Sequence, residues 1–266
     1  YVRRYSQLME KRTKGKHGWF NYYSNDTCIG RSLEYYGEYC ELEIDLIKQF
    51  INEDSVVLDV GANIGTHSVP LSKYAGTVHA FEACFENYAM LCRNSPRSCN
   101  YHCAVSNYSG QAKVKNLDLT TEGNYGKVTT SRFENGNVSA ISIDSLELPR
   151  VNFIKVDVEG NEPNVLQGAY ATVRRDKPHI LIEAQDENTY VPLYRMLKEQ
   201  MNYYLYWFPV ATYNPNNYKK NQINIFGKQH GVLNWVATTR MLDGLEPVSG
   251  ENDTIEQAQV RQFNRK

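Results

Sequence analysis

Several features that mark other protein classes are missing from this 266-residue chain. No apolar run approaches the roughly 20 residues of a membrane-spanning helix, and no signal-peptide apolar segment opens the chain. The net charge is only −1, so nothing favours nucleic acid as a partner. The six cysteines include no Cys-x-x-Cys pair, which argues against a zinc site or a disulfide scaffold. We therefore expect reduced thiols and a cytoplasmic location.

The residue types that are present fit one globular domain with extensions. Hydrophobic residues make up 41% and charged residues 22% of the chain. We expect a helical N-terminal extension over 1–53, a main domain over 54–245 and a polar C-terminal tail over 246–266. Six basic residues lie within the first 16, which fits a solvated helix or linker better than a nucleic-acid-binding arm. The chain begins at Tyr1, not methionine, which is compatible with a processed form or with one domain of a longer polypeptide.

Short apolar runs alternate with segments of helical periodicity. Strands are expected at 56–60, 77–81, 101–105, 153–158, 180–182, 203–208 and 232–237. Helices are expected at 41–51, 68–74, 85–93, 161–172 and 191–200, the fourth capped by Asn161. Residues 107–137 suit a β-meander or a loop excursion. This alternation predicts an α/β fold with a mostly parallel, doubly wound sheet and helices on both faces.

A glycine turn follows the first of these strands. In Leu58-Asp59-Val60-Gly61-Ala62-Asn63-Ile64-Gly65 the glycines let a ligand approach the backbone, and free amides would face an anionic group. The dinucleotide spacing G-x-G-x-x-G is absent because position 63 is Asn. Glu82 ends the next strand, about 20 residues further on, where an acid can bind ribose hydroxyls. An adenosine-containing ligand is therefore expected.

Carboxylates gather after two later strands. Asp157 and Glu159 follow one strand and Glu183 ends the next. Such acids can act as a general base, as partners of a cationic ligand or as ligands of a hard metal ion. A plain alternative is that Asp157 caps the following helix. His67 and His102 are weaker candidates for the base.

These segments together resemble the FkbM-type methyltransferases. The resemblance is carried by VVLDVGANIGTHS, VHAFEA, SIDSL, FIKVDVEGNEPNVLQGA and KPHILIEA, preceded by Tyr36-Gly37-Glu38, and it covers residues 36 to about 184. It implies a Rossmann-like class I methyltransferase fold with a seven-stranded sheet whose last strand is antiparallel. It also implies S-adenosylmethionine as cofactor and O-methylation, often of sugars or natural products.

The resemblance also implies roles for individual residues. Those that match the loop around the methionine part of the cofactor are Asp59, Gly61, Asn63 and Gly65. Glu82 matches the ribose-binding acid, and Asp157 and Glu159 match the acids near the transferred methyl group. The chain departs from the family pattern at Pro70, inside the first core helix, and at Cys84, where proline is common. Both departures bear on local geometry rather than on a functional group.

We therefore predict an O-methyltransferase acting on a hydroxyl of a small molecule or glycan, most of all a sugar, with Asp157 or Glu159 as the base. The 20 tyrosines are concentrated near the N-terminus and between Tyr190 and Tyr218, and their flat apolar faces with hydroxyl groups suit contact with a carbohydrate ring or, alternatively, a half-solvated packing layer. The expected acceptor-binding residues are Glu38, Glu183, Tyr206 and Trp207. A divalent metal is compatible with the acids but not indicated. The alternatives are a nucleic-acid methyltransferase, for which the tetrapeptide (Asp/Asn)-Pro-Pro-(Tyr/Phe) is missing, and a non-catalytic interaction module.

Overall fold

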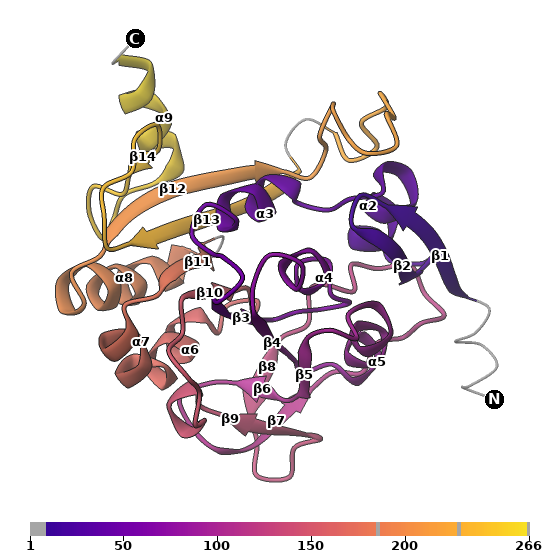
Figure 1. The fold of residues 1–266 in the computed structure, drawn as a ribbon, viewed down its shortest axis with the longest axis horizontal. Coiled ribbons are helices and arrows are strands. Elements are labelled where there is room, and N and C mark those ends of the chain that lie inside the picture. Colours follow the sequence, from indigo (N-terminus) through magenta and orange to yellow (C-terminus); the bar gives the residue numbers. More distant parts are fainter. Residues whose placement is uncertain (1–8, 185–186, 228–229, 265–266) are drawn as a thin grey trace.

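An eight-stranded mixed sheet forms the centre of the molecule (Figure 1). The computed structural model describes residues 9–184, 187–227 and 230–264. The strands of the large sheet, from one edge to the other, are β14 (Glu246–Pro247), β12 (Tyr204–Ala211), β13 (Gly231–Thr238), β11 (His179–Glu183), β10 (Phe153–Val156), β3 (Val56–Val60), β4 (Thr77–Glu82) and β5 (Cys99–His102). The five strands from β5 to β11 are parallel, and β13 runs antiparallel to both β11 and β12.

This topology confirms the predicted Rossmann-like alternation and the antiparallel strand. The expected number of seven strands is wrong, because the two-residue β14 pairs with β12 and adds an eighth at the edge. The segment expected as one strand at 101–105 divides into β5 and β6 (Ala104–Val105), and β6 belongs to a second sheet. The chain thus leaves the large sheet immediately after β5.

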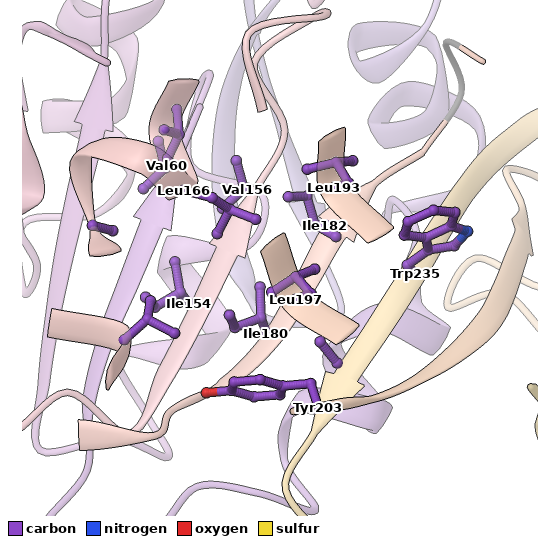
Figure 2. Close-up of a cluster of buried hydrophobic side chains, with 14 of the residues drawn as sticks. Val60, Ile154, Val156, Leu166, Ile180, Ile182, Leu193, Leu197, Tyr203 and Trp235 are labelled. Carbon is purple, nitrogen blue, oxygen red and sulfur yellow. The ribbon is translucent and has the colours of Figure 1, made fainter. Parts of the chain in front are cut away.

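Alternate residues of the central strands face two different helical layers. Ile154 and Val156 pack with the apolar residues of α6 (Glu162–Gly168) and α8 (Tyr190–Tyr194), as Figure 2 shows. Phe153 points to the opposite face, where α3 (Glu41–Ile47) and α4 (Ser68–Leu71) contribute their apolar side chains. All three strand residues are at most 1% exposed. The period of two along each strand therefore places helices on both faces, as predicted.

Three further helical segments complete these layers. Leu91 of α5 (Phe85–Asn94) packs against Ala80 of β4. The helix expected over 161–172 is interrupted at Ala169, after which α7 (Tyr170–Asp176) continues. Asn161 occupies the N-cap position of α6 but makes no capping bond; Glu162 instead accepts hydrogen bonds from the Val158 and Gly160 amides. A π-helical segment, Arg195–Gln200, extends α8.

The basic N-terminal stretch forms a strand where it is described, not the expected helix or linker. β1 (Glu10–Gly15) and β2 (Gly18–Tyr23) pair as an antiparallel hairpin. The hairpin is held down because Phe20 and its aromatic neighbours on β2 are buried against α2 (Ile29–Tyr36). Tertiary packing of β2 therefore decides the structure of the charged β1, which keeps most of its lysine and arginine side chains in solvent.

Residues 104–141 contain the second sheet. Its strands, in spatial order, are β6, β9 (Val138–Ile141), β7 (Gly110–Val114) and β8 (Thr130–Arg132). This sheet is not the β-meander expected as one possibility for 107–137, because β9 pairs with β6 and β7 instead of β8. The C-terminal residues also join the body of the protein: β14 pairs with β12, and Asp253 accepts a hydrogen bond from Trp207 before α9 (Ile255–Asn264). Among the described residues, no helix has the length and apolar character needed to cross a membrane.

Candidate functional site

A cavity of about 270 Å³ lies at the carboxyl ends of the central parallel strands. This is the edge at which open α/β sheets bind their ligands. The predicted site residues that line it are Gly61, Asn63, Glu82, Asp157, Glu159 and Glu183. These residues come from four neighbouring strand ends, and their convergence follows from the parallel alignment of β4, β3, β10 and β11.

The glycine turn after β3 needs glycine for two separate reasons. Gly61 has φ +82°, and a Cβ atom there would lie 1.7 Å from the Asp157 carbonyl oxygen. The turn therefore packs its backbone directly against the end of β10. Asn63 also adopts a left-handed conformation, with φ +50°, which Asn tolerates better than most residues.

The amides of this turn do not behave as predicted. The Gly61 and Ala62 N–H groups both donate to the Phe81 carbonyl, and the Gly65 N–H donates to the Ala62 carbonyl. The Asn63 amide donates to the Glu82 carboxylate. These donors are already used inside the protein, so the expectation that they face an anionic group is corrected. The hydrogen bonds instead fix the position of the turn beside the cavity.

Glu82 is buried at the end of β4 and lines the cavity. Its Oε2 accepts from the Asn63 amide at 2.8 Å, and its Oε1 accepts from the Cys84 amide at 2.7 Å. Each oxygen keeps a second lone pair, so the carboxylate can still accept two hydroxyl groups. Burial raises the pKa of Glu82 to about 7, against the effect of the two amides. Cys84, at the position where the family favours proline, thus supplies an amide that proline lacks.

Asp59 and Gly65 support the turn from behind and do not line the cavity. Asp59 is fully buried, and its Oδ2 accepts a hydrogen bond from the Ser68 hydroxyl at 2.6 Å. Gly65 has φ +90°, and a Cβ atom there would lie 2.9 Å from a methyl carbon of Leu91. The structure thus gives both residues a role in shaping the turn.

Three acids meet on the other side of the cavity. Asp157 follows β10, Glu183 is the last residue of β11, and Glu159 lies in a turn between them in sequence. One oxygen of each carboxylate lies within 4.8 Å of the other two. Glu159 has φ +54° and is followed by Gly160 at φ +94°. This left-handed pair turns the chain so that Glu159 reaches the same cavity as Asp157. We call these three residues the acid cluster.

Lys155 is the cation that the sequence reading did not single out. It is buried within β10, with Nζ 3.1 Å from Asp157 Oδ2 and 3.8 Å from Asp59 Oδ1. The signal was a lysine inside the apolar run Phe153–Val156. A buried ammonium group needs such partners, because an unpaired charge is costly in the protein interior. Lys155 therefore links Asp59 to the acid cluster.

The acids of the cluster differ in protonation. Burial would raise the pKa of Asp157, but Lys155 beside it lowers that pKa below its usual range. Burial and the Asp157 charge raise the pKa of Glu159 to about 7. Burial, and then Asp157 and Glu159, raise the pKa of Glu183 to about 10. Asp157 is therefore ionised at neutral pH while Glu183 holds a proton.

The remaining predicted groups are divided between the cavity and the core. His67 lines the cavity, and its Nε2 lies 2.9 Å from Glu43 Oε2 on α3. His102 does not line it, and bonds the Ala83 carbonyl instead. Asp157 pairs with Lys155, so the structure does not support the alternative that it only caps a helix.

Glu38, Tyr206 and Trp207 are not brought to the cavity, contrary to the expectation that they bind the acceptor. Glu38 accepts hydrogen bonds from the Asn214 side chain and the Tyr218 amide, which anchors the 214–218 loop. Tyr206 and Trp207 are buried in opposite faces of the sheet. Alternation along β12 commits both aromatic rings to packing.

One wall of the cavity comes from a segment to which no functional role was given. Asn124 and Lys127, between β7 and β8, and Thr130, the first residue of β8, all line it. The Tyr125 carbonyl accepts hydrogen bonds from the Asn63 and Asn87 side chains. This loop lacks regular periodicity, so only its polar composition could have suggested a binding wall.

The order of strands, the antiparallel β13 and the cavity at the carboxyl edge define a Rossmann-like class I methyltransferase fold. Residues 59–206, more than half of the chain, match the family model described as the methyltransferase FkbM domain. The chain belongs to the FkbM methyltransferase family.

A curated relative and two solved structures illustrate the similarity. The hexuronic acid methyltransferase AglP of Haloferax volcanii is 35% identical over 133 residues, covering 47% of this chain and 54% of that protein. The chain thus spans about half the length of this relative. The FkbM methyltransferase of Methylobacillus flagellatus KT matches with TM-score 0.47 and 16% identity over 70% of this chain and 44% of that one. The precorrin-6y C5,15-methyltransferase of Geobacter metallireducens GS-15 matches with TM-score 0.45 and 14% identity. The match covers 74% of this chain and 85% of that one.

Proposed function

We propose that this protein is an S-adenosylmethionine-dependent O-methyltransferase whose acceptor is a sugar hydroxyl. The observation that carries the proposal is the placement of Glu82 and the acid cluster in one cavity of an FkbM-family fold. Two strand spacings separate the ends of β4 and β10, which corresponds to about 10 Å. One end of the cavity can thus bind the ribose while the other receives the acceptor.

The cofactor end is built around a carboxylate that retains acceptor capacity. Glu82 keeps a free lone pair on each oxygen, which suits the two adjacent hydroxyls of a ribose. The ionised Asp157 lies toward the other end, where its charge favours a sulfonium. This arrangement supports a ligand with a sugar diol at one end and a positive charge at the other.

The reaction moves a methyl cation between two nucleophiles. The acceptor oxygen forms a bond to the methyl carbon as the carbon–sulfur bond breaks. The electron pair of the broken carbon–sulfur bond stays on sulfur. The sulfonium thereby becomes a neutral thioether, and the hydroxyl proton must leave. We assign that proton to Glu159, because a base with a pKa near 7 suits neutral pH. A general base of this kind accelerates the reaction by about 10²–10⁴-fold. Holding the two reactants in line lowers the activation free energy by a further ~7–11 kcal/mol.

A sugar acceptor fits the chemistry of the cavity wall. Asn124, Lys127 and Thr130 offer donors and acceptors beside the acid cluster. Carboxylates and amides of this kind pair with the hydroxyl groups of a sugar ring. The name of the Haloferax relative adds a hexuronic acid as the first acceptor to be tried.

The test is methyl transfer from S-[methyl-³H]adenosylmethionine to a panel of hexoses, hexuronic acids, glycans and small alcohols. We expect a labelled sugar ether with the wild-type chain, and at least 100-fold less with Asp157→Asn or Glu159→Gln. Glu147→Gln is the matched control, because Glu147 is exposed and lies outside the cavity.

The chemical stability of the product distinguishes the acceptor oxygens. A methyl ether survives mild alkali, whereas a methyl ester of a uronic acid is hydrolysed. An alkali-labile product would show that the methyl group is transferred to a carboxylate instead of a hydroxyl. Failure to bind S-adenosylhomocysteine in calorimetry would refute the methyltransferase proposal itself and favour a non-catalytic module.

A further inference from the structure

The proposed function leaves one charged part of the cofactor without a binding group. The amino-acid end of S-adenosylmethionine carries a carboxylate as well as an ammonium group. The backbone amides of the glycine turn, which were expected to face an anion, are already used inside the protein. A carboxylate needs hydrogen-bond donors when it leaves water. Donors for it must therefore come from side chains on the cavity wall.

Four basic side chains of the described chain line the cavity, and three of them are engaged elsewhere. Lys155 pairs with two aspartates. His230 shares a hydrogen bond with a threonine hydroxyl. The charge of Lys127 acts to lower the pKa of Glu159, which places this lysine on the side assigned to the acceptor. The fourth basic residue is His67.

His67 is only 4% exposed, and its side chain lines the cavity. Its Nε2 lies 2.9 Å from Glu43 Oε2, and the Asn234 side-chain amide donates to Glu43 Oε1 at 3.0 Å. Glu43 and Asn234 are buried as well. Neither ring nitrogen of His67 forms a regular hydrogen bond with a described residue. The imidazole can therefore still donate to a ligand in the cavity.

Tyr39 supplies a second donor. It lies between α2 and α3, and its side chain lines the cavity. Within the described chain its hydroxyl meets only two thiols, those of Cys28, at 3.9 Å, and Cys40. Burial raises the pKa of Tyr39 well above its ordinary value, so the phenol keeps its proton. Because sulfur is a weak acceptor, this proton is available to an oxygen atom of a ligand.

Tyr39 and His67 share two neighbours. After burial and the two cysteines, the charges of Asp157 and Glu43 contribute to the raised pKa of Tyr39. His67 adds to the effect of Lys155 in lowering the pKa of Asp157, and its ring contacts Glu43. Both donors thus lie near the carboxylate assigned to the sulfonium. The amino-acid chain of the cofactor begins at that sulfur, which brings its carboxylate within their reach.

We propose that Tyr39 and His67 bind the carboxylate at the amino-acid end of the cofactor, and that Glu43 holds His67 in position. The inference rests on the proposed function and names the residues for a part of the ligand to which that function gives none. Both ring nitrogens of His67 then act as donors, one toward Glu43 and one toward the ligand, which is the imidazolium form. Tyr39 and Glu43 precede residue 59, where the match to the family model begins. This end of the site therefore comes largely from the N-terminal part of the chain.

The experiment compares two ligands by isothermal calorimetry. They are S-adenosylhomocysteine and its decarboxylated analogue, which keeps the nucleoside, the sulfur and the ammonium group. We expect Tyr39→Phe and His67→Gln each to weaken S-adenosylhomocysteine binding by about tenfold or more, because a hydrogen bond to a charged group is lost. Both variants should bind the analogue like the wild type. Glu43→Gln should show the same ligand-selective loss, which a merely structural role would not produce.

The matched control is Tyr35→Phe, because Tyr35 is 44% exposed and lies outside the cavity. This variant should bind both ligands like the wild type. Far-ultraviolet circular dichroism verifies that each variant is folded.

The outcomes separate this inference from the proposed function. If the wild type binds S-adenosylhomocysteine but folded Tyr39→Phe and His67→Gln weaken both ligands equally, or neither, the inference is refuted while the methyltransferase proposal stands. Equal affinity of the wild type for the two ligands would also refute it, because no group would then recognise the carboxylate. If the wild type binds neither ligand, both proposals fail.

Discussion

The protonation of Glu82 should control the affinity for the cofactor. Burial raises the pKa of this carboxyl to about 7 in the ligand-free protein. Ribose hydroxyls donate hydrogen bonds to the ionised form, so binding requires that the proton leave. Affinity should therefore be full above pH 8 and fall as pH decreases through 7, which is the sign expected of an acid with a raised pKa.

The magnitude follows from the ionised fraction. With a pKa of about 7, roughly 90% of Glu82 is ionised at pH 8 and roughly 10% at pH 6. The affinity for S-adenosylhomocysteine should then differ by about tenfold between these pH values, or about 1.4 kcal/mol. Glu82→Gln should weaken binding at pH 8 by a similar factor or more, because an amide cannot accept from the turn and the ribose with both of its atoms.

Isothermal calorimetry at pH 6, 7 and 8 measures this dependence in wild type and in Glu82→Gln. Glu159 titrates in the same range, so Glu159→Gln serves as the second comparison. We expect the pH dependence to persist in Glu159→Gln and to disappear in Glu82→Gln. An unchanged slope in Glu82→Gln, or a wild-type difference below twofold, would show that Glu82 does not bind the ribose.

The remaining predictions concern stability. Gly61→Ala places a Cβ atom against the Asp157 carbonyl at φ +82°, and should lower the free energy of unfolding in urea by about 3 kcal/mol or more. The control Gly250→Ala, whose Cβ would meet no atom within 4 Å, should leave this free energy unchanged. Equal effects of the two substitutions would refute the packing argument. Glu159→Gln should raise the free energy of unfolding by about 1 kcal/mol at pH 8, allowing for solvent screening, and should leave it unchanged at pH 4. The reason is that the charge of wild-type Glu159 destabilises the folded state as pH rises from 4.5 to about 7. Thermal melts at both pH values test this prediction, and stabilisation at pH 4 would contradict it. Glu38→Ala should lower the free energy of unfolding by about 2 kcal/mol, because Asn214 and Tyr218 lose their hydrogen-bond acceptor. The affinity for S-adenosylhomocysteine should not change. A loss of affinity would show that Glu38 does contribute to the binding site.

The sequence predicted best where one local rule dominates. Val56–Val60 and His179–Glu183 are apolar runs bounded by polar residues, and both are central parallel strands. Neighbouring parallel strands end at the same edge, so Glu82 at the end of β4, Asp157 after β10 and Glu183 at the end of β11 could be placed in one cavity without coordinates. Gly61 was also identifiable, although its closest contact is the backbone of Asp157, not a ligand.

Prediction was weaker where distant packing decides the outcome. The charged residues of β1 carry no strand periodicity, and only the burial of Phe20 and its neighbours on β2 fixes the hairpin. Tyr206 and Trp207 were expected at the acceptor, but successive residues of β12 point to opposite faces of the sheet, and each ring is packed in the hydrophobic cluster on its face. The amides of the glycine turn were expected to be free. The Gly61 and Ala62 amides instead donate to the Phe81 carbonyl, which lies on another strand and whose proximity the local sequence does not show.

The position of Lys155 explains how four acids can end four adjacent strands without unfolding the sheet. Asp59, on β3, and Asp157, after β10, both approach its ammonium group, which leaves Glu82 and Glu183 as the outer members of the row. Burial raises the pKa of each outer acid, and neither has a cation within ion-pair distance in the described chain. The two outer acids are therefore the ones that gain most from a ligand. In the proposed function, Glu82 takes the hydroxyls of a ribose. If the proposed function holds, the lysine thus separates the carboxylate that binds the cofactor from those that face the acceptor.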